Sequence, residues 1–200
     1  MPHATPTERG MSVKPLEDSD MKIAGDSFDP AEPTGDDSDQ TARELEHQKE
    51  NGNLSRARRL GALMADDLSA VEGGNPAGDS VLQSQRRILL AFAVQMGLEC
   101  FLPGKLLTET ATAVFFDTLR ETAPAFYEDL QESGAFSFYY LCVREGGDAV
   151  PKVGKTFASL CGRADNASYI RMGEELYRRF IDQVKHFVDV LGFVTEEDAS

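Results

Sequence analysis

The sequence predicts an all-α protein, a compact bundle of five to six helices that follows a long, disordered, acidic N-terminal tail. Three observations support this prediction. Apolar residues in the second half of the chain recur at helical spacing, whereas proline and glycine interrupt the first 40 residues. All five Tyr and eleven of the twelve Phe lie after residue 91. Because aromatic side chains supply much of the apolar area of a small core, that core must lie in the second part of the chain.

The charge of the chain limits the partners that it can have. Residues 1–80 carry 17 acidic and 8 basic residues, and residues 81–200 carry 17 and 12, which gives a net charge of −14. Neither part has the basic field that nucleic-acid binding needs, and anionic lipid surfaces repel both parts. The N-terminus lacks the pattern of a secretory signal. We therefore expect a cytoplasmic protein with no nucleic-acid or membrane partner.

The composition divides the chain into three parts. Residues 1–79 are predicted to be a disordered acidic tail, residues 80–195 the helical domain, and residues 196–200 a disordered C-terminus. The boundary near residue 80 follows a stretch rich in Gly, Asn and Pro, which is typical of a linker.

One segment of the tail, residues 53–72, has the pattern of a docking helix. Leu60, Leu63, Met64 and Leu68 recur every three to four residues, so one face of the helix would be apolar. A helix of about 18 residues is marginal by itself in water. We expect it to form only when it docks in a groove, which belongs either to this domain or to a partner protein.

Six helices are predicted within the domain. The first begins at Asp79 or Ser80 and is apolar nearly all round, which is typical of a central, buried helix. Residues 135–145 alternate as a strand would, but no second strand-like run exists to pair with them, so a buried helix is predicted. Asp165 or Asn166 is expected to cap the last helix, which is the clearest in the sequence. The remaining helices are predicted over about 106–119, 124–132 and 151–161.

The sequence carries no pattern of catalytic, metal-binding or cofactor-binding residues. Gly154-Lys155-Thr156 resembles the end of a phosphate-binding loop, but Ala149 stands where the first Gly of the full pattern is required. A helix turn with a small residue at a packing contact is the preferred interpretation. His186 is the only histidine of the predicted domain, and it lacks the further ligands that a metal ion requires. No catalytic residue, cofactor or metal is predicted.

The order of helices between residues 86 and 187 loosely resembles a single cyclin box. The resemblance rests on 87–90 opening the first helix, Arg144 after an apolar helix and Glu174 in a later helix. It implies that Arg144 and Glu174 contact a kinase. Because the matching residues are common ones, and Arg144 stands where the family has Lys, we do not assign the chain to this family.

Two functions remain open from the sequence. The first is a non-catalytic protein–protein interaction or regulatory module. Its partner-binding residues would be those of the docking helix together with the cyclin-like pair: Leu60, Leu63, Met64, Leu68, Arg144 and Glu174. The alternative is a small-molecule-binding or catalytic helical domain with a pocket between helices, near Tyr139, Tyr140, Arg144 and Lys155. The number of Phe and Tyr residues also leaves room for some rings to face outward and form a groove.

Overall fold

The computed structural model describes residues 35–70, 80–144 and 146–195, with side chains from residue 39 onward. Contacts divide the chain into two units, Met1–Asp39 and Gln40–Ser200. The first unit lies almost entirely outside the described residues, so the described fold is that of the second. The disorder predicted for residues 1–34, 71–79 and 196–200 also falls outside the described residues.

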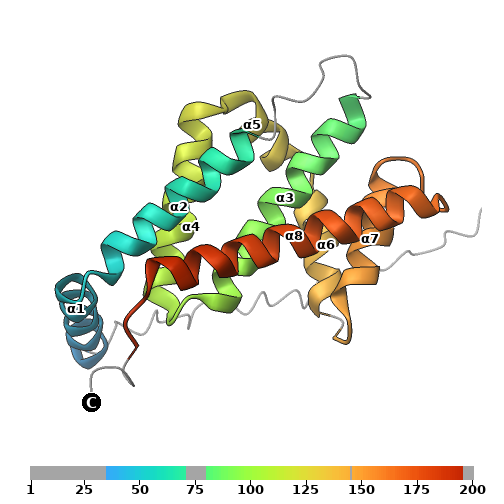
Figure 1. Cartoon of the computed structure of the whole chain (residues 1–200). Coiled ribbons are helices and arrows are strands. Elements are labelled where there is room, and N and C mark those ends of the chain that lie inside the picture. Colours follow the sequence, from blue (N-terminus) through green and yellow to red (C-terminus); the bar gives the residue numbers. More distant parts are fainter. Residues whose placement is uncertain (1–34, 71–79, 145, 196–200) are drawn as a thin grey trace, which may run out of the picture. The chain divides into compact units, whose positions relative to one another are not determined.

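The described residues form eight helices and no strand, which confirms the predicted all-α class (Figure 1). Helices α3–α8 correspond to the six helices predicted in the domain. The count exceeds the predicted five to six because α1 and α2 arise from the segment that the sequence assigns to the tail. The helices are α1 (Gly35–Glu50), α2 (Asn53–Ala70), α3 (Ser80–Phe101), α4 (Lys105–Thr122), α5 (Pro124–Glu132), α6 (Ala135–Arg144), α7 (Ala149–Leu160) and α8 (Ala167–Leu191).

Helix α3 forms the centre of the unit, as its apolar pattern predicts. The side chains from Ile88 to Val94 are at most 1% exposed. The helix contacts α2 and each of α4–α8. Because these helices surround residues 88–94, that part of α3 has no face left for water, and its sequence has no polar stripe.

Helix α2 packs along α4 within the same unit (Figure 1). Leu60, Met64 and Leu68 are at most 1% exposed. A Cβ atom on Gly61 would lie 2.3 Å from the Ala111 carbonyl oxygen, so the two backbones approach closely there. The compact unit consequently begins at Gln40, whereas the sequence places the start of the domain near residue 80.

Helices α7 and α8 cross at two glycines. A Cβ on Gly154 would lie 2.7 Å from the Ile170 carbonyl oxygen, and one on Gly173 would lie 2.8 Å from Phe157 Cβ. Gly154-Lys155-Thr156 therefore belongs to a helix, and its glycine lies at a packing contact, as the preferred interpretation of this motif predicts. Close packing of this kind requires small residues on both helices.

The ends of α7 and α8 follow the capping rules. Asp148 precedes α7 and accepts a hydrogen bond from the Val150 amide at 3.1 Å, and Asn166 caps α8 by accepting one from the Ser168 amide at 3.0 Å. Gly192 ends α8 in the left-handed conformation with φ of 62°, which glycine adopts without steric cost. Asn166 is thus one of the two caps predicted for the last helix.

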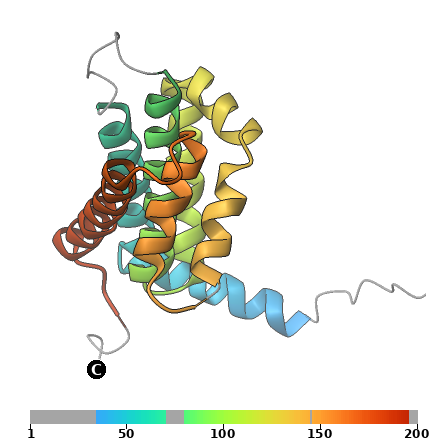
Figure 2. The ribbon, with the colours of Figure 1, turned by 90° about the vertical axis from the view of Figure 1, so that its right-hand side faces the viewer.

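Helix α6 occupies residues that alternate as a strand would, and the structure confirms the predicted helix there. It lies beside α7 (Figure 2) and also contacts α3. The ring of Tyr139 stacks on Phe92 of α3, with centroids 5.2 Å apart, and Phe136 meets Phe92 edge-on at 5.6 Å. Cys142 Sγ lies 3.1 Å from Thr156 Oγ1 of α7. Aromatic side chains that favour a strand in isolation are held in a helix by these contacts with α3 and α7.

Candidate functional site

The predicted docking helix is an integral part of the fold. Leu60, Met64 and Leu68 are buried, Leu63 is half-buried, and the helix packs mainly on α4. The groove that receives α2 in the structure belongs to this chain. Leu60, Met64 and Leu68 therefore present no exposed surface to another protein, whereas part of the Leu63 side chain remains in contact with water.

The other two predicted partner-binding residues lie on different helices. Arg144 is exposed at the end of α6. Glu174 lies on α8, where its side chain is 22% exposed and forms a long ion pair with Arg178 at 3.9 Å. Its Cγ atom also packs where a Cβ of Gly154 would be. Arg144 and the buried residues of α2 thus do not form one continuous exposed surface.

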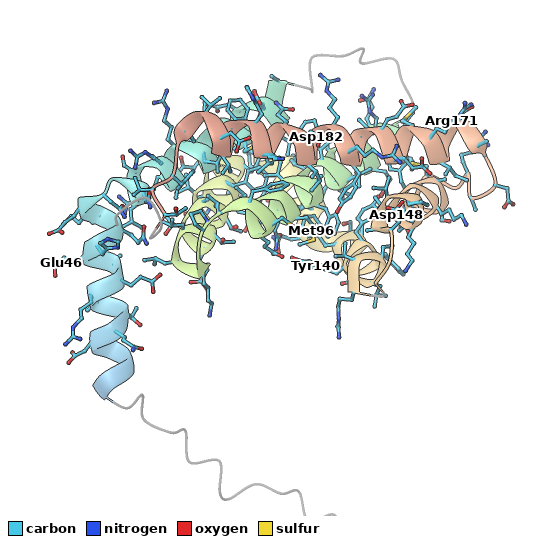
Figure 3. The ribbon with its side chains drawn as sticks, turned by 60° about the horizontal axis from the view of Figure 1, so that its bottom comes forward. Glu46, Met96, Tyr140, Asp148, Arg171 and Asp182 are labelled. Atoms are coloured by element: carbon cyan, nitrogen blue, oxygen red, sulfur yellow. The ribbon has the colours of Figure 1, made fainter. Side chains whose placement is uncertain are left out.

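The residues proposed for a pocket between helices do not share one. Tyr139 is fully buried, and its hydroxyl has no hydrogen-bond partner within the described residues. Tyr140, labelled in Figure 3, instead bonds to residues of α3 near the surface. Arg144 and Lys155 are exposed on α6 and α7. The arrangement supplies no convergent set of catalytic groups from these four residues.

The most distinctive surface feature is an apolar face on α6. Phe138 is 54% exposed and Leu141 is 53% exposed. Residues three apart are neighbours on a helix, so the two side chains form one continuous patch. Single exposed apolar residues are common, whereas adjacent ones of this size mark binding surfaces more often. We call this pair the α6 face.

A hollow of about 310 Å³ lies beside the α6 face. Ser137 lines it and lies one helical turn before Leu141 on α6, which connects the two features. Phenylalanine and leucine side chains give the hollow an apolar lining, and two glutamine amides add polar groups to it. Its lining residues come from α3, α4, α5, α6 and the turn before α6: Gln95, Phe116, Leu130, Gln131, Gly134, Phe136 and Ser137.

A hydrogen-bonded triad connects α3 and α6 close to this hollow. Gln95 Nε2 donates to Tyr140 Oη and to Glu99 Oε1, the latter at 3.0 Å, and Tyr140 Oη donates to Glu99 Oε1 at 3.2 Å. Burial, and then the negative charge of Glu99, raise the pKa of Tyr140 to about 12. The phenol therefore stays protonated at neutral pH and fixes the position of Gln95 at the rim of the hollow.

The α6–α7 hairpin differs in charge from the rest of this acidic chain. Residues 135–163 contain four basic and two acidic residues, against a total of −14 for the protein. Arg144 and Lys155 are exposed. Arg144 follows Leu141 by three positions on α6, and Lys155 is adjacent to Thr156, which contacts Cys142. One of the two acidic residues, Asp148, is engaged in capping α7 (Figure 3).

A second basic cluster has a structural explanation. Arg56 and Arg59 of α2 line a surface hollow with Val190 and Leu191, the last residues of α8. Arg56 Nη1 also donates to the Asn51 carbonyl at 2.7 Å. The free carbonyls at the C-terminal end of a helix carry partial negative charge. Arg56 and Arg59 lie near the N-terminal end of α2, where positive charge is unfavourable for that helix. They also lie beside the C-terminal end of α8, where positive charge is favourable.

Within the described ranges, no group of three or more His, Cys, Asp or Glu side chains is arranged to hold a metal ion. None of the described helices combines the length and apolarity that a membrane crossing requires. His186 is exposed on α8.

Comparisons with protein families, with curated proteins and with solved structures find no match for this chain. The functional argument therefore depends on the surface itself.

The sequence did not single out Phe138 and Leu141. Helix α6 is apolar on almost every side, so its pattern does not separate the face that meets α3 from the face that meets water. The expectation that some aromatic rings face outward was the nearest signal, and Phe138 is such a ring.

Proposed function

We propose that this protein is a non-catalytic interaction module whose partner protein binds the α6 face and the adjoining hollow. The observation that carries the proposal is the pair of half-exposed side chains, Phe138 and Leu141, at adjacent positions on one helix. Leaving them in water forgoes the stabilisation of about 25 cal/mol for each Å² of apolar surface that burial provides. A partner that covers them recovers it.

The proposal moves the binding surface away from the predicted docking helix. Helix α2 packs on α4, and Leu60, Met64 and Leu68 of the predicted docking face are buried within this chain. An interaction at α6 requires no rearrangement of the described fold, because its residues are already exposed. The predicted cytoplasmic location is compatible with such a module.

The test is quantitative affinity capture with a double variant, Phe138→Asp/Leu141→Asp. Val190→Asp is the matched control, since Val190 is also an exposed apolar residue, at 66%, but lies on α8. Both proteins should melt within a few degrees of the wild type. We expect the double variant to lose partners that the wild type and the control retain. Equal capture by all three proteins would contradict the proposal.

A further inference from the structure

The Asn53 side chain joins three segments of the chain at one buried point. Its amide nitrogen donates to Gln48 Oε1 at the end of α1 and to the Val194 carbonyl oxygen, both at 2.8 Å. Its amide oxygen accepts from the Val194 amide at 3.0 Å and from Arg56 Nη1 at 3.1 Å. We propose that residues 192–195, the segment after α8, form a releasable strap, and that the Asn53 amide couples the release of this strap to the loosening of the end of α1.

The strap begins at a residue that can act as a hinge. Gly192 ends α8 with φ of 62°, and a Cβ built on it would meet no atom within 4 Å. No side chain therefore resists rotation at this point. Beyond the hinge, Phe193 and Val194 are only half-buried, so the strap buries much less apolar surface than residues 88–94 of α3. Segments with little buried apolar surface open at a lower free energy than the core.

The bonds to Val194 fix the orientation of the Asn53 amide. An Asn side chain has two N–H donors and two lone pairs on its oxygen, and all four are used here. Because Val194 offers both a donor and an acceptor, it determines which side of the amide carries the oxygen. That orientation presents the second N–H to Gln48 and the second lone pair to Arg56. Without Val194 the amide rotates over a broad range, so the bonds to Gln48 and Arg56 weaken.

The end of α1 depends on the same amide. Of the described side chains of α1, those of residues 39–50, only Gln48 is not exposed. A helix of 16 residues is marginal by itself in water. Gln48 Oε1 accepts from Asn53 Nδ2 at 2.8 Å and from Asn51 Nδ2 at 3.3 Å, and these two bonds anchor the helix. Loosening of the Asn53 amide therefore reaches α1 through this anchor.

Release of the strap also widens a hollow of about 270 Å³ at the ends of α3 and α8. Gly192, Phe193 and Thr195 of the strap line this hollow together with Phe101 of α3 and Val188 of α8. When the strap leaves, the apolar side chains of the two helices become accessible. None of these residues belongs to the α6 face, so the strap is separate from the proposed binding surface.

Hydrogen exchange of single amides, measured by NMR on the full-length protein at increasing low urea concentrations, tests the strap. The Val194 amide reports on the strap, and the amides of Asn51 and Gly52, which donate to carbonyls in the last turn of α1, report on the end of that helix. We expect all three to exchange about tenfold faster or more than those of residues 88–94, with a weak dependence on urea, because a local opening exposes little surface. Exchange of Val194 that follows 88–94 in rate and urea dependence would overturn the strap.

Two variants on opposite sides of Asn53 test the coupling. Phe193→Ala removes a half-buried ring from the strap, and it should speed the exchange of Val194 about tenfold and that of the two α1 amides to a similar extent. Gln48→Ala removes the anchor of α1 and should speed the exchange of Val194 in turn, because coupling between two sites is reciprocal. Val190→Ala, at an exposed position of α8, is the control and should change none of these rates. Faster exchange confined to the side that carries the substitution would overturn the coupling.

Discussion

Asn53 and Val194, which are 141 positions apart in the sequence, pair through two hydrogen bonds. Asn53 Nδ2 donates to the Val194 carbonyl oxygen at 2.8 Å, and Asn53 Oδ1 accepts from the Val194 amide at 3.0 Å. Asn53 is fully buried, and it also donates to Gln48 Oε1 at 2.8 Å and accepts from Arg56 Nη1 at 3.1 Å. One side chain thus ties the α1–α2 turn to the segment that follows α8.

This pairing predicts a strong coupling between the two residues. Asn53→Ala should destabilise the fold, because each buried partner left unsatisfied costs about 1–3 kcal/mol. Val194→Pro removes the amide that donates to Asn53. If the two residues act as a pair, the double variant should be less destabilised than the sum of the single changes. Urea unfolding of all four proteins measures this, and strict additivity would show that the two residues act independently.

The close approach of α2 and α4 predicts the effect of a small substitution. Gly61→Ala places a methyl group 2.3 Å from the Ala111 carbonyl oxygen, so one helix must shift. We expect a loss of about 1–3 kcal/mol, typical of overpacking, although alanine favours a helix by about 1 kcal/mol over glycine. Ser55→Ala, at an exposed position of the same helix, is the control for helix propensity. A Gly61→Ala protein as stable as the wild type would contradict the packing of α2 on α4.

The buried hydroxyl of Tyr139 predicts an unusual response to its removal. The group has no hydrogen-bond partner in the described part of the chain, and burial raises its pKa well above the ordinary value. Tyr139→Phe keeps the ring stacked on Phe92 and removes a buried, unsatisfied group, which otherwise costs about 1–3 kcal/mol. Thermal melting should show an unchanged or higher midpoint. A clearly lower midpoint would reveal that the hydroxyl makes a bond.

Tyr140 gives the protein a predicted dependence on alkaline pH. Its pKa in the folded protein is about 12, above the ordinary tyrosine value of about 10, because burial and the Glu99 carboxylate disfavour the phenolate. The folded state therefore binds this proton more tightly than the unfolded state. The resulting stabilisation is complete below pH 10 and disappears as the pH rises toward 12.

The titration of Tyr140 can be followed by NMR of ¹³C-labelled tyrosine, with Tyr140→Phe to assign the signal. Glu99→Gln removes the second cause of the shift, so the pKa of Tyr140 should fall in that variant while burial keeps it raised. An ordinary pKa for Tyr140 in the wild type would show that the triad with Gln95 and Glu99 is absent in solution.

Much of the fold follows from sequence patterns that have a single structural solution. The all-round apolar character of 88–94 has no explanation other than a central helix, and α3 is that helix. Asn166 and Gly192 mark the two ends of α8 because each satisfies a backbone requirement of a helix terminus. Phe180, on the apolar face of α8, is 4% exposed.

The location of contacts between distant segments is what the sequence could not provide. The periodicity of Leu60, Met64 and Leu68 identifies an apolar face, but it does not say whether that face meets α4 or another protein. Asn53 lies in a run of Asn and Gly that is typical of a turn between helices. Its burial depends on residue 194, which follows α8 and lies against it. The exposure of Phe138 and Leu141 depends in the same way on which sides of α6 meet α3 and α7.

The most direct test of the central claim is photo-crosslinking from the α6 face in the native cells. A photoreactive phenylalanine analogue at position 138 changes an exposed aromatic residue very little, and the same analogue at position 190 is the control. We predict a discrete protein adduct from position 138 that is absent from position 190. Identical adducts from both positions, or none from position 138, would contradict the assignment of α6 as the binding surface.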